Sequence, residues 1–123
     1  MGTYTTPAIG AAAEVKLFGI GVTIVQPGPF RTGFGGARLR WARSNPAYED
    51  LIGPPRRAFE AGHGAQPNDP AKGARAILAA VERPDPPLHL PLGPEAFDWI
   101  GAHLKSRLDA LEASRALGSD TAY

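Results

Sequence analysis

Residues 19–32 read Gly19-Ile20-Gly21-Val22-Thr23-Ile24-Val25-Gln26-Pro27-Gly28-Pro29-Phe30-Arg31-Thr32. The first half is rich in Val, Ile and Thr, which is typical of a buried β-strand, and we expect this strand over Ile20–Val25. Pro27-Gly28 ends it, because proline fixes φ and glycine permits backbone conformations closed to other residues. A buried strand that ends in such a turn is typical of open α/β sheets, whose ligands lie outside the carboxyl ends of the strands.

Helices are predicted both before and after this strand in the sequence. The Ala-rich stretch Ala8–Leu17 precedes it, and Gly19 is placed to stop that helix. Asp69-Pro70 is a strong helix start, an N-cap followed by proline at the first helical position, and the apolar stripe behind it continues to Glu82. The last helix is predicted over Pro94–Leu117, with one apolar face.

The remaining elements are short. Ala47–Ile52 and Pro55–Ala61 are predicted as two helices separated at Gly53-Pro54-Pro55, because an interior proline removes a donor and clashes with the preceding turn. Leu88–Leu92 is predicted as a brief strand closed by Gly93.

Two strands are too few for a complete sheet. Ile20–Val25 has the pattern of a strand buried on both faces, yet its only candidate partner in the sequence is Leu88–Leu92. Such a pair leaves unpaired edges and apolar faces. The sequence therefore predicts an α/β fold, the second half of a larger parallel sheet, with about two strands and four to five helices. We expect residues 1–123 to be one piece of a single domain.

Composition excludes several classes of protein. The 123 residues are 43% hydrophobic and carry a net charge of +1, so no global charge favours nucleic acid or a membrane surface. The chain has no cysteine, which excludes disulfides and thiolate metal sites. It has no apolar run of the roughly 20 residues that a membrane span needs, and no signal-peptide pattern. We expect a cytoplasmic protein that binds neither nucleic acid nor membrane.

Two further clusters are weak candidates for sites. The histidines lack the spacing of metal ligands, so no metal site is predicted; they are His63, His89 and His103. Three arginines near Trp41 in the sequence resemble a small nucleic-acid-binding patch, but arginines in a loop usually form a solvated surface. They are Arg38, Arg40 and Arg43.

Four segments, in order, resemble the short-chain dehydrogenase/reductase family. They correspond to the end of the family's catalytic helix, the loop after the sixth strand, the capped start of the next helix and the final strand; here they are Ala12–Ile20, Pro27–Thr32, Gln66–Lys72 and Leu88–Gly93. The resemblance implies that the fold is the C-terminal portion of a Rossmann-like doubly wound parallel sheet. It implies NAD or NADP as cofactor and a small carbonyl or alcohol substrate. It also implies a homo-oligomer for the full-length protein.

The same resemblance shows what this sequence lacks. The family's Gly-rich phosphate loop and catalytic Ser would precede residue 1, and Gly33–Gly36 does not match the G-x-G-x-x-G pattern. The family's catalytic Tyr and Lys stand four apart on a helix, but Tyr4 is followed at that offset by Ala8, and Tyr48 by Ile52. No catalytic residue is therefore predicted, and we expect a truncated gene product or a fragmentary sequence.

The resemblance does assign roles within the loop after the first strand. Thr32 would hydrogen-bond the nicotinamide carboxamide, and Pro27 and Gly28 would shape the backbone near the ring. Phe30 and Phe34 would wall the substrate side. The alternatives from the residues alone are a cap or turn role for Thr32 and plain core packing for the two phenylalanines.

Two functions follow as hypotheses. The first is the C-terminal segment of an oxidoreductase that transfers hydride between NAD(P) and a carbonyl or alcohol, inactive alone because the catalytic and phosphate-binding parts are absent. The second is a non-catalytic interaction module that associates with another chain through its sheet edge and its last helix.

Overall fold

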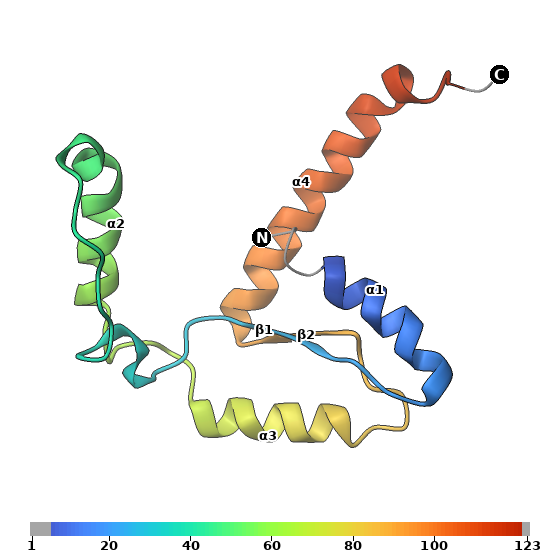
Figure 1. The fold of residues 1–123 in the computed structure, drawn as a ribbon, viewed down its shortest axis with the longest axis horizontal. Helices are drawn as coiled ribbons and strands as arrows, with labels where there is room; N and C mark the ends of the chain where they lie inside the picture. The colour runs from blue at the N-terminus through green and yellow to red at the C-terminus, as the bar shows by residue number, and fades with distance from the viewer. Residues whose placement is uncertain (1–5, 122–123) are drawn as a thin grey trace.

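The computed structural model describes residues 6–121 (Figure 1). Its helices and strands are α1 (Thr6–Val15), β1 (Ile24–Pro27), α2 (Glu49–Ala61), α3 (Pro70–Val81), β2 (His89–Leu92) and α4 (Pro94–Gly118), with single 3₁₀ turns at Lys16–Phe18, Gly33–Gly35 and Pro46–Tyr48. Tyr4 lies outside the described residues.

β1 and β2 form a parallel two-stranded sheet in which Ile24 pairs with His89 and Pro27 with Leu92. A hydrogen bond from Gly28 N to Leu92 O, 2.8 Å, continues the ladder past β1. α3 lies on one side of the strands and α1 and α4 lie on the other, as Figure 1 shows. A parallel sheet with helices on both faces is the doubly wound α/β arrangement, so the predicted fold class is confirmed.

The first strand begins at Ile24, four residues later than predicted. The reason lies in its partner. Ile24 N donates to Leu88 O at 2.7 Å, and Leu88 is preceded by Pro86 and Pro87. Prolines have no N–H to offer a neighbouring strand, so the ladder cannot extend toward Ile20 on this side.

The prediction of two helices around Gly53-Pro54-Pro55 is wrong. A single helix, α2, runs through both prolines. Proline's fixed φ is close to the helical value, so the backbone continues while two helical hydrogen bonds are lost. Gly53 is buried beneath the ion pair of Glu49 with Arg57 (3.3 Å), which spans this part of the helix.

Two predicted helix boundaries are confirmed, the start at Asp69-Pro70 and the stop at Gly19, whereas α4 includes Gly118. Asp69 accepts a hydrogen bond from Ala71 N at 2.8 Å and caps α3, with Pro70 at the first helical position. Gly19 ends the first helical segment at φ 71° and Gly93 precedes α4 at φ 87°, values that favour glycine.

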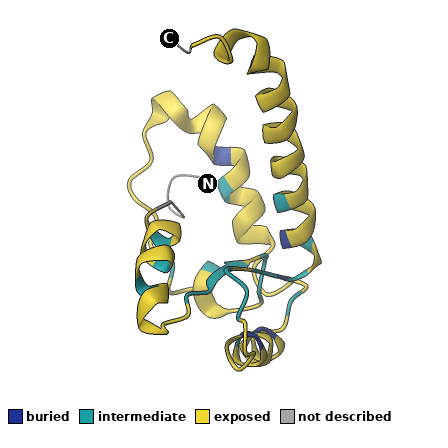
Figure 2. Ribbon diagram, turned by 90° about the vertical axis from the view of Figure 1, so that its right-hand side faces the viewer, coloured by how far each residue is buried: buried dark blue, intermediate teal, exposed yellow. Residues whose placement is uncertain are grey.

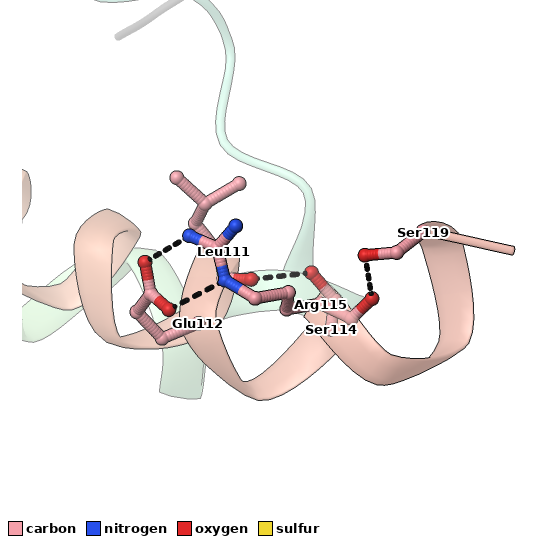
Figure 3. Close-up of polar contacts among 5 residues, drawn as sticks. All are labelled: Leu111, Glu112, Ser114, Arg115 and Ser119. Atoms are coloured by element: carbon pink, nitrogen blue, oxygen red, sulfur yellow. Dashed lines mark hydrogen bonds and ion pairs between the residues drawn. The ribbon is translucent and has the colours of Figure 1, made fainter.

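α4 ends in a cluster of local polar contacts (Figure 3). Arg115 pairs with Glu112 at 2.6 Å, and this bond lowers the pKa of Glu112 and raises the pKa of Arg115. Ser119 Oγ donates to Arg115 O at 2.5 Å, and Ser114 Oγ to Leu111 O at 2.9 Å. Both serine hydroxyls thus add a second hydrogen bond to backbone carbonyls in the last turns of α4. Among residues 6–121, no helix is both long and apolar enough to cross a bilayer.

Very little of the described chain is buried (Figure 2). Its buried hydrophobic residues are Ala80, Leu92 and Ala96. The accessible surface is 10125 Å², against about 6,300 Å² expected for a folded monomer of this mass. Large apolar side chains of α4 remain exposed, namely Phe97, Trp99, Leu104, Leu108 and Leu111. These helices and strands therefore present apolar faces that the described residues do not cover.

Candidate functional site

The site predicted from sequence lies at the carboxyl end of β1, where the chain leaves the sheet. The loop there runs beside the segment that leads into α3. Phe30 forms a parallel bridge with Asn68, and Arg31 N donates to Asn68 O at 2.9 Å. Arg31 Nε donates to Gln66 O at 3.0 Å. The loop after β1 is thus held by backbone pairing as well as by side chains.

Asn68 ties three segments together. Its side-chain amide donates to Pro29 O at 2.9 Å and to Glu95 Oε2 at 2.8 Å, in a half-buried position. It also fills the space beside Gly93, where an added Cβ would lie 2.7 Å from the amide nitrogen. Asn68 therefore fixes the loop after β1 against the first turn of α4.

The same contact lowers the pKa of the Glu95 side chain. The hydrogen bond from Asn68, followed by one from the backbone N–H of Glu95 itself, lowers the pKa of the Glu95 carboxyl. Desolvation opposes this shift. Glu95 stands in the first turn of α4, where a negative charge also suits the helix dipole.

Pro27 and Gly28 lie at the end of β1, where the chain turns away from the sheet. Pro27 is the last residue of β1 and is exposed. An added Cβ on Gly28 would lie 3.3 Å from Ala96 N and from Leu92 O. Glycine at this position therefore allows β1 to approach the start of α4 closely.

Thr32 occupies the position of a cap. Its Oγ1 accepts a hydrogen bond from Phe34 N at 3.3 Å, at the start of the turn Gly33–Gly35. The side chain is exposed and lines an open hollow of about 370 Å³ with four neighbours, Gly33, Phe34, Arg38 and Leu39. The hydroxyl hydrogen is not used by this cap, so Thr32 retains a donor for a ligand.

Phe30 and Phe34 point to different places. Phe30 packs against α3, since an added Cβ on Gly73 would lie 2.7 Å from Phe30 Cε1. Phe34 is 70% exposed and meets Phe59 of α2 edge to face, with ring centroids 6.4 Å apart. The structure does not bring the two phenylalanines into one wall, and only Phe34 lines the hollow with Thr32.

Sequence reasoning missed the contacts that attach α2 to the loop. Trp41 meets Phe59 edge to face at 6.0 Å, and the Arg56 guanidinium lies 4.7 Å from the centre of the Trp41 ring. His63 packs against Gly36, where an added Cβ would lie 2.9 Å from its Cε1. Aromatic residues in an otherwise irregular stretch were the available signal for this small cluster.

The described residues fit only one end of a dinucleotide. Thr32 offers a hydroxyl donor beyond a strand end, which suits a carboxamide oxygen. Pyrophosphate binding needs a Gly-rich turn between a strand and a helix start. Gly33–Gly35 instead forms a 3₁₀ turn away from the start of any α-helix, and His63 lies against the following Gly36. In the same range, 6–121, no group of three His, Asp or Glu side chains is arranged to hold a metal ion.

Comparison with known proteins identifies relatives of this chain. A solved short-chain dehydrogenase from Streptomyces avermitilis has 38% sequence identity and a TM-score of 0.80, over 98% of this chain and 43% of that chain. An oxidoreductase from Botryotinia fuckeliana is 30% identical over 90 residues, which are 73% of this chain and 33% of that protein. An uncharacterized oxidoreductase from Schizosaccharomyces pombe is 33% identical over 104 residues, 84% of this chain and 35% of that protein.

No protein-family model matches the chain. The chain spans about a third of the length of the curated relatives and 43% of the solved one. Within that span, sequence identity and backbone geometry agree with the resemblance of the four segments. The chain belongs to the short-chain dehydrogenase/reductase family, and its fold matches the C-terminal portion of the family's Rossmann-like sheet.

Proposed function

We propose that the loop after β1 forms the nicotinamide side of an NAD(P) site in an oxidoreductase that acts on a carbonyl or alcohol. The observation that carries this proposal is Thr32, whose exposed hydroxyl stands beyond the carboxyl end of β1 in an open hollow. Nicotinamide supplies or accepts the hydride when bound. Thr32 donates to its carboxamide, which orients the ring, and Pro27 and Gly28 shape the backbone beside it.

The rest of the chain keeps this loop in place. Asn68 holds Pro29 against the start of α4, and Arg31 is paired with the segment before α3. A loop fixed at several points presents Thr32 in one orientation, which reduces the entropy lost on binding. Proton transfer and pyrophosphate binding require residues that this sequence does not supply, so we propose that another segment of the fold contributes them.

A chimeric protein tests the proposal. The part of the Streptomyces avermitilis short-chain dehydrogenase that matches this chain is replaced by residues 1–123, and oxidation of NADH and NADPH is followed with a panel of aldehydes and ketones. We expect carbonyl-dependent oxidation of one of the two cofactors. Thr32→Val should raise the KM for the cofactor about fivefold to tenfold, because it removes one hydrogen bond of roughly 1 kcal/mol.

Thr32→Ser is the matched control. It keeps both the hydroxyl donor and the acceptor that caps Phe34 N, so cofactor binding should return close to that of the parent. A folded chimera that oxidises neither cofactor, or in which Thr32→Val leaves the KM unchanged, would contradict the proposed role.

A second function rests on the exposed apolar surface. The chain has about 3,800 Å² more accessible surface than a compact monomer of its size, whereas a standard interface covers about 800 Å² on each partner. We propose as the alternative a non-catalytic module whose partner is a polypeptide that supplies further parallel strands. Such a partner would pair with the free edge of β1 and cover the apolar side chains of α4.

Sedimentation of the purified chain tests this alternative. The interaction module is expected to sediment as an oligomer or, in cell extract, with a partner chain. A stable, folded monomer would count against the interaction module, and it would also contradict the expectation that part of the sheet is supplied from elsewhere.

A further inference from the structure

The candidate site lies in a long stretch without acidic residues. Between Glu14 and Glu49 the sequence contains no Asp or Glu. The same stretch carries five basic residues, Lys16, Arg31, Arg38, Arg40 and Arg43. Because the whole chain has a net charge of only +1, this positive charge is concentrated around the loop that follows β1. A local excess of one sign attracts ligands of the other sign.

One of these arginines faces the site. Arg38 lines the same hollow as Thr32 and Phe34 and is exposed. Among the described residues its guanidinium makes no ion pair, since the four ion pairs found there involve Arg56, Arg57, Lys105 and Arg115. Arg31 differs, because Gln66 O already accepts from its Nε.

We propose that the substrate carries an anionic group, a carboxylate or a phosphate, which Arg38 binds, while Phe34 contacts the apolar part of the same molecule. This inference rests on the proposed function, because Thr32 places the nicotinamide end at the same hollow. A guanidinium offers two parallel N–H donors, which match the two oxygens of a carboxylate or phosphate. The exposed ring of Phe34 gives the substrate an apolar surface beside that charge.

A small anion fits this charge distribution better than a nucleic acid. A strand of nucleic acid requires a series of free cations along its backbone. Arg56 lies over Trp41 and pairs with Glu60 at 3.2 Å, and Arg57 pairs with Glu49. The positive charge on the α2 side is therefore partly neutralised. Arg38, Arg40 and Arg43 make no ion pair among the described residues, but of these three only Arg38 lines the hollow, so the hollow presents one cation and not a series.

The test is an NMR titration of the full chain with three probes of similar shape: benzoate, phenyl phosphate and benzyl alcohol. We expect saturable shifts of the amides of residues 32–39 with one or both anions, and affinity at least about fivefold weaker for benzyl alcohol. Arg38→Gln should lower the affinity for the anion about fivefold or more. Arg75→Gln, an equal charge change on the exposed surface of α3, should leave it unchanged.

Each outcome has a defined meaning. A preference for benzoate or for phenyl phosphate identifies which anionic group the site takes. Equal binding of benzyl alcohol, equal losses in Arg38→Gln and Arg75→Gln, or tighter binding of a short single-stranded oligonucleotide would overturn the inference. The probes contain no nicotinamide. If the chain binds the anion but the chimera is inactive, only the proposed function is contradicted. If the chimera is active but the chain does not bind the anion, only this inference is contradicted.

Discussion

The side-chain amide of Asn68 donates to the Glu95 carboxylate at 2.8 Å, joining the segment before α3 to the first turn of α4. The same amide donates to Pro29 O, in the loop that carries Thr32. One side chain thus connects parts of the chain that are far apart in sequence. The arrangement of the candidate site depends on it.

Asn68→Ala should destabilise the chain by about 1–3 kcal/mol, because half-buried partners lose their donor and a space opens beside Gly93. Urea unfolding followed by circular dichroism measures this. Asn45→Ala is the control, since Asn45 makes one exposed bond to Ala47 N and its loss should cost about 1 kcal/mol or less. Equal effects of the two substitutions would show that Asn68 has no special structural role.

Stability should fall in acid, and Glu95 should account for part of the fall. Its pKa is lowered in the folded chain, first by the Asn68 hydrogen bond, so its contribution is fully present above the ordinary glutamate value of about 4.3. The contribution is lost as the pH falls through the lower pKa of the folded state. Urea unfolding between pH 3 and 6 should show a smaller pH dependence for Glu95→Gln than for the parent. An identical dependence in both would be inconsistent with the observed contact.

Gly73→Ala should destabilise the chain by about 1–3 kcal/mol, because the new methyl group would overlap the Phe30 ring under α3. Gly101→Ala makes the same change inside α4, where an added Cβ meets nothing within 4 Å. There the better helix propensity of alanine should stabilise by about 0.5–1 kcal/mol. Thermal unfolding of both variants compares the signs, and a stabilised Gly73→Ala would show that Phe30 does not pack as described.

The isolated chain should bind neither NADH nor NADPH at low micromolar concentration. Thr32 offers a carboxamide one hydrogen bond, worth roughly 0.5–1.5 kcal/mol net, whereas micromolar binding needs about 8 kcal/mol. Titration calorimetry on residues 1–123 measures this. A dissociation constant in the low micromolar range would mean that the described residues hold more of the cofactor than the carboxamide end.

Local chemistry in the sequence predicted much of the fold. Asp69-Pro70 specifies a helix start through the cap and fixed φ of two adjacent residues, and Gly19 specifies a helix end through its left-handed conformation. These features need no distant partner. They were therefore readable from the sequence alone, as was the pairing of two short apolar strands.

The features that were missed depend on distant residues. The start of β1 is set by Pro86 and Pro87 in the neighbouring segment. Asn68 looked like part of a helix start, while its partners lie in other segments. The two interpretations of Thr32 prove compatible in geometry, because a capping hydroxyl accepts one bond and keeps a proton to donate. Its role toward a cofactor stays a prediction.

The parallel pairing of β1 with β2 has a consequence for folding. Ile24 can pair with His89 only after the ribosome has synthesised the intervening loop, α2 and α3. Non-local pairing of this kind is slow, because the closure of a long loop precedes any gain from the ladder. α3 can form early from local contacts, whereas the apolar β1 has no β2 to pair with, and its backbone amides remain unpaired, until β2 has been synthesised. The interval between the synthesis of the two strands is thus the period in which the nascent chain is most prone to aggregate.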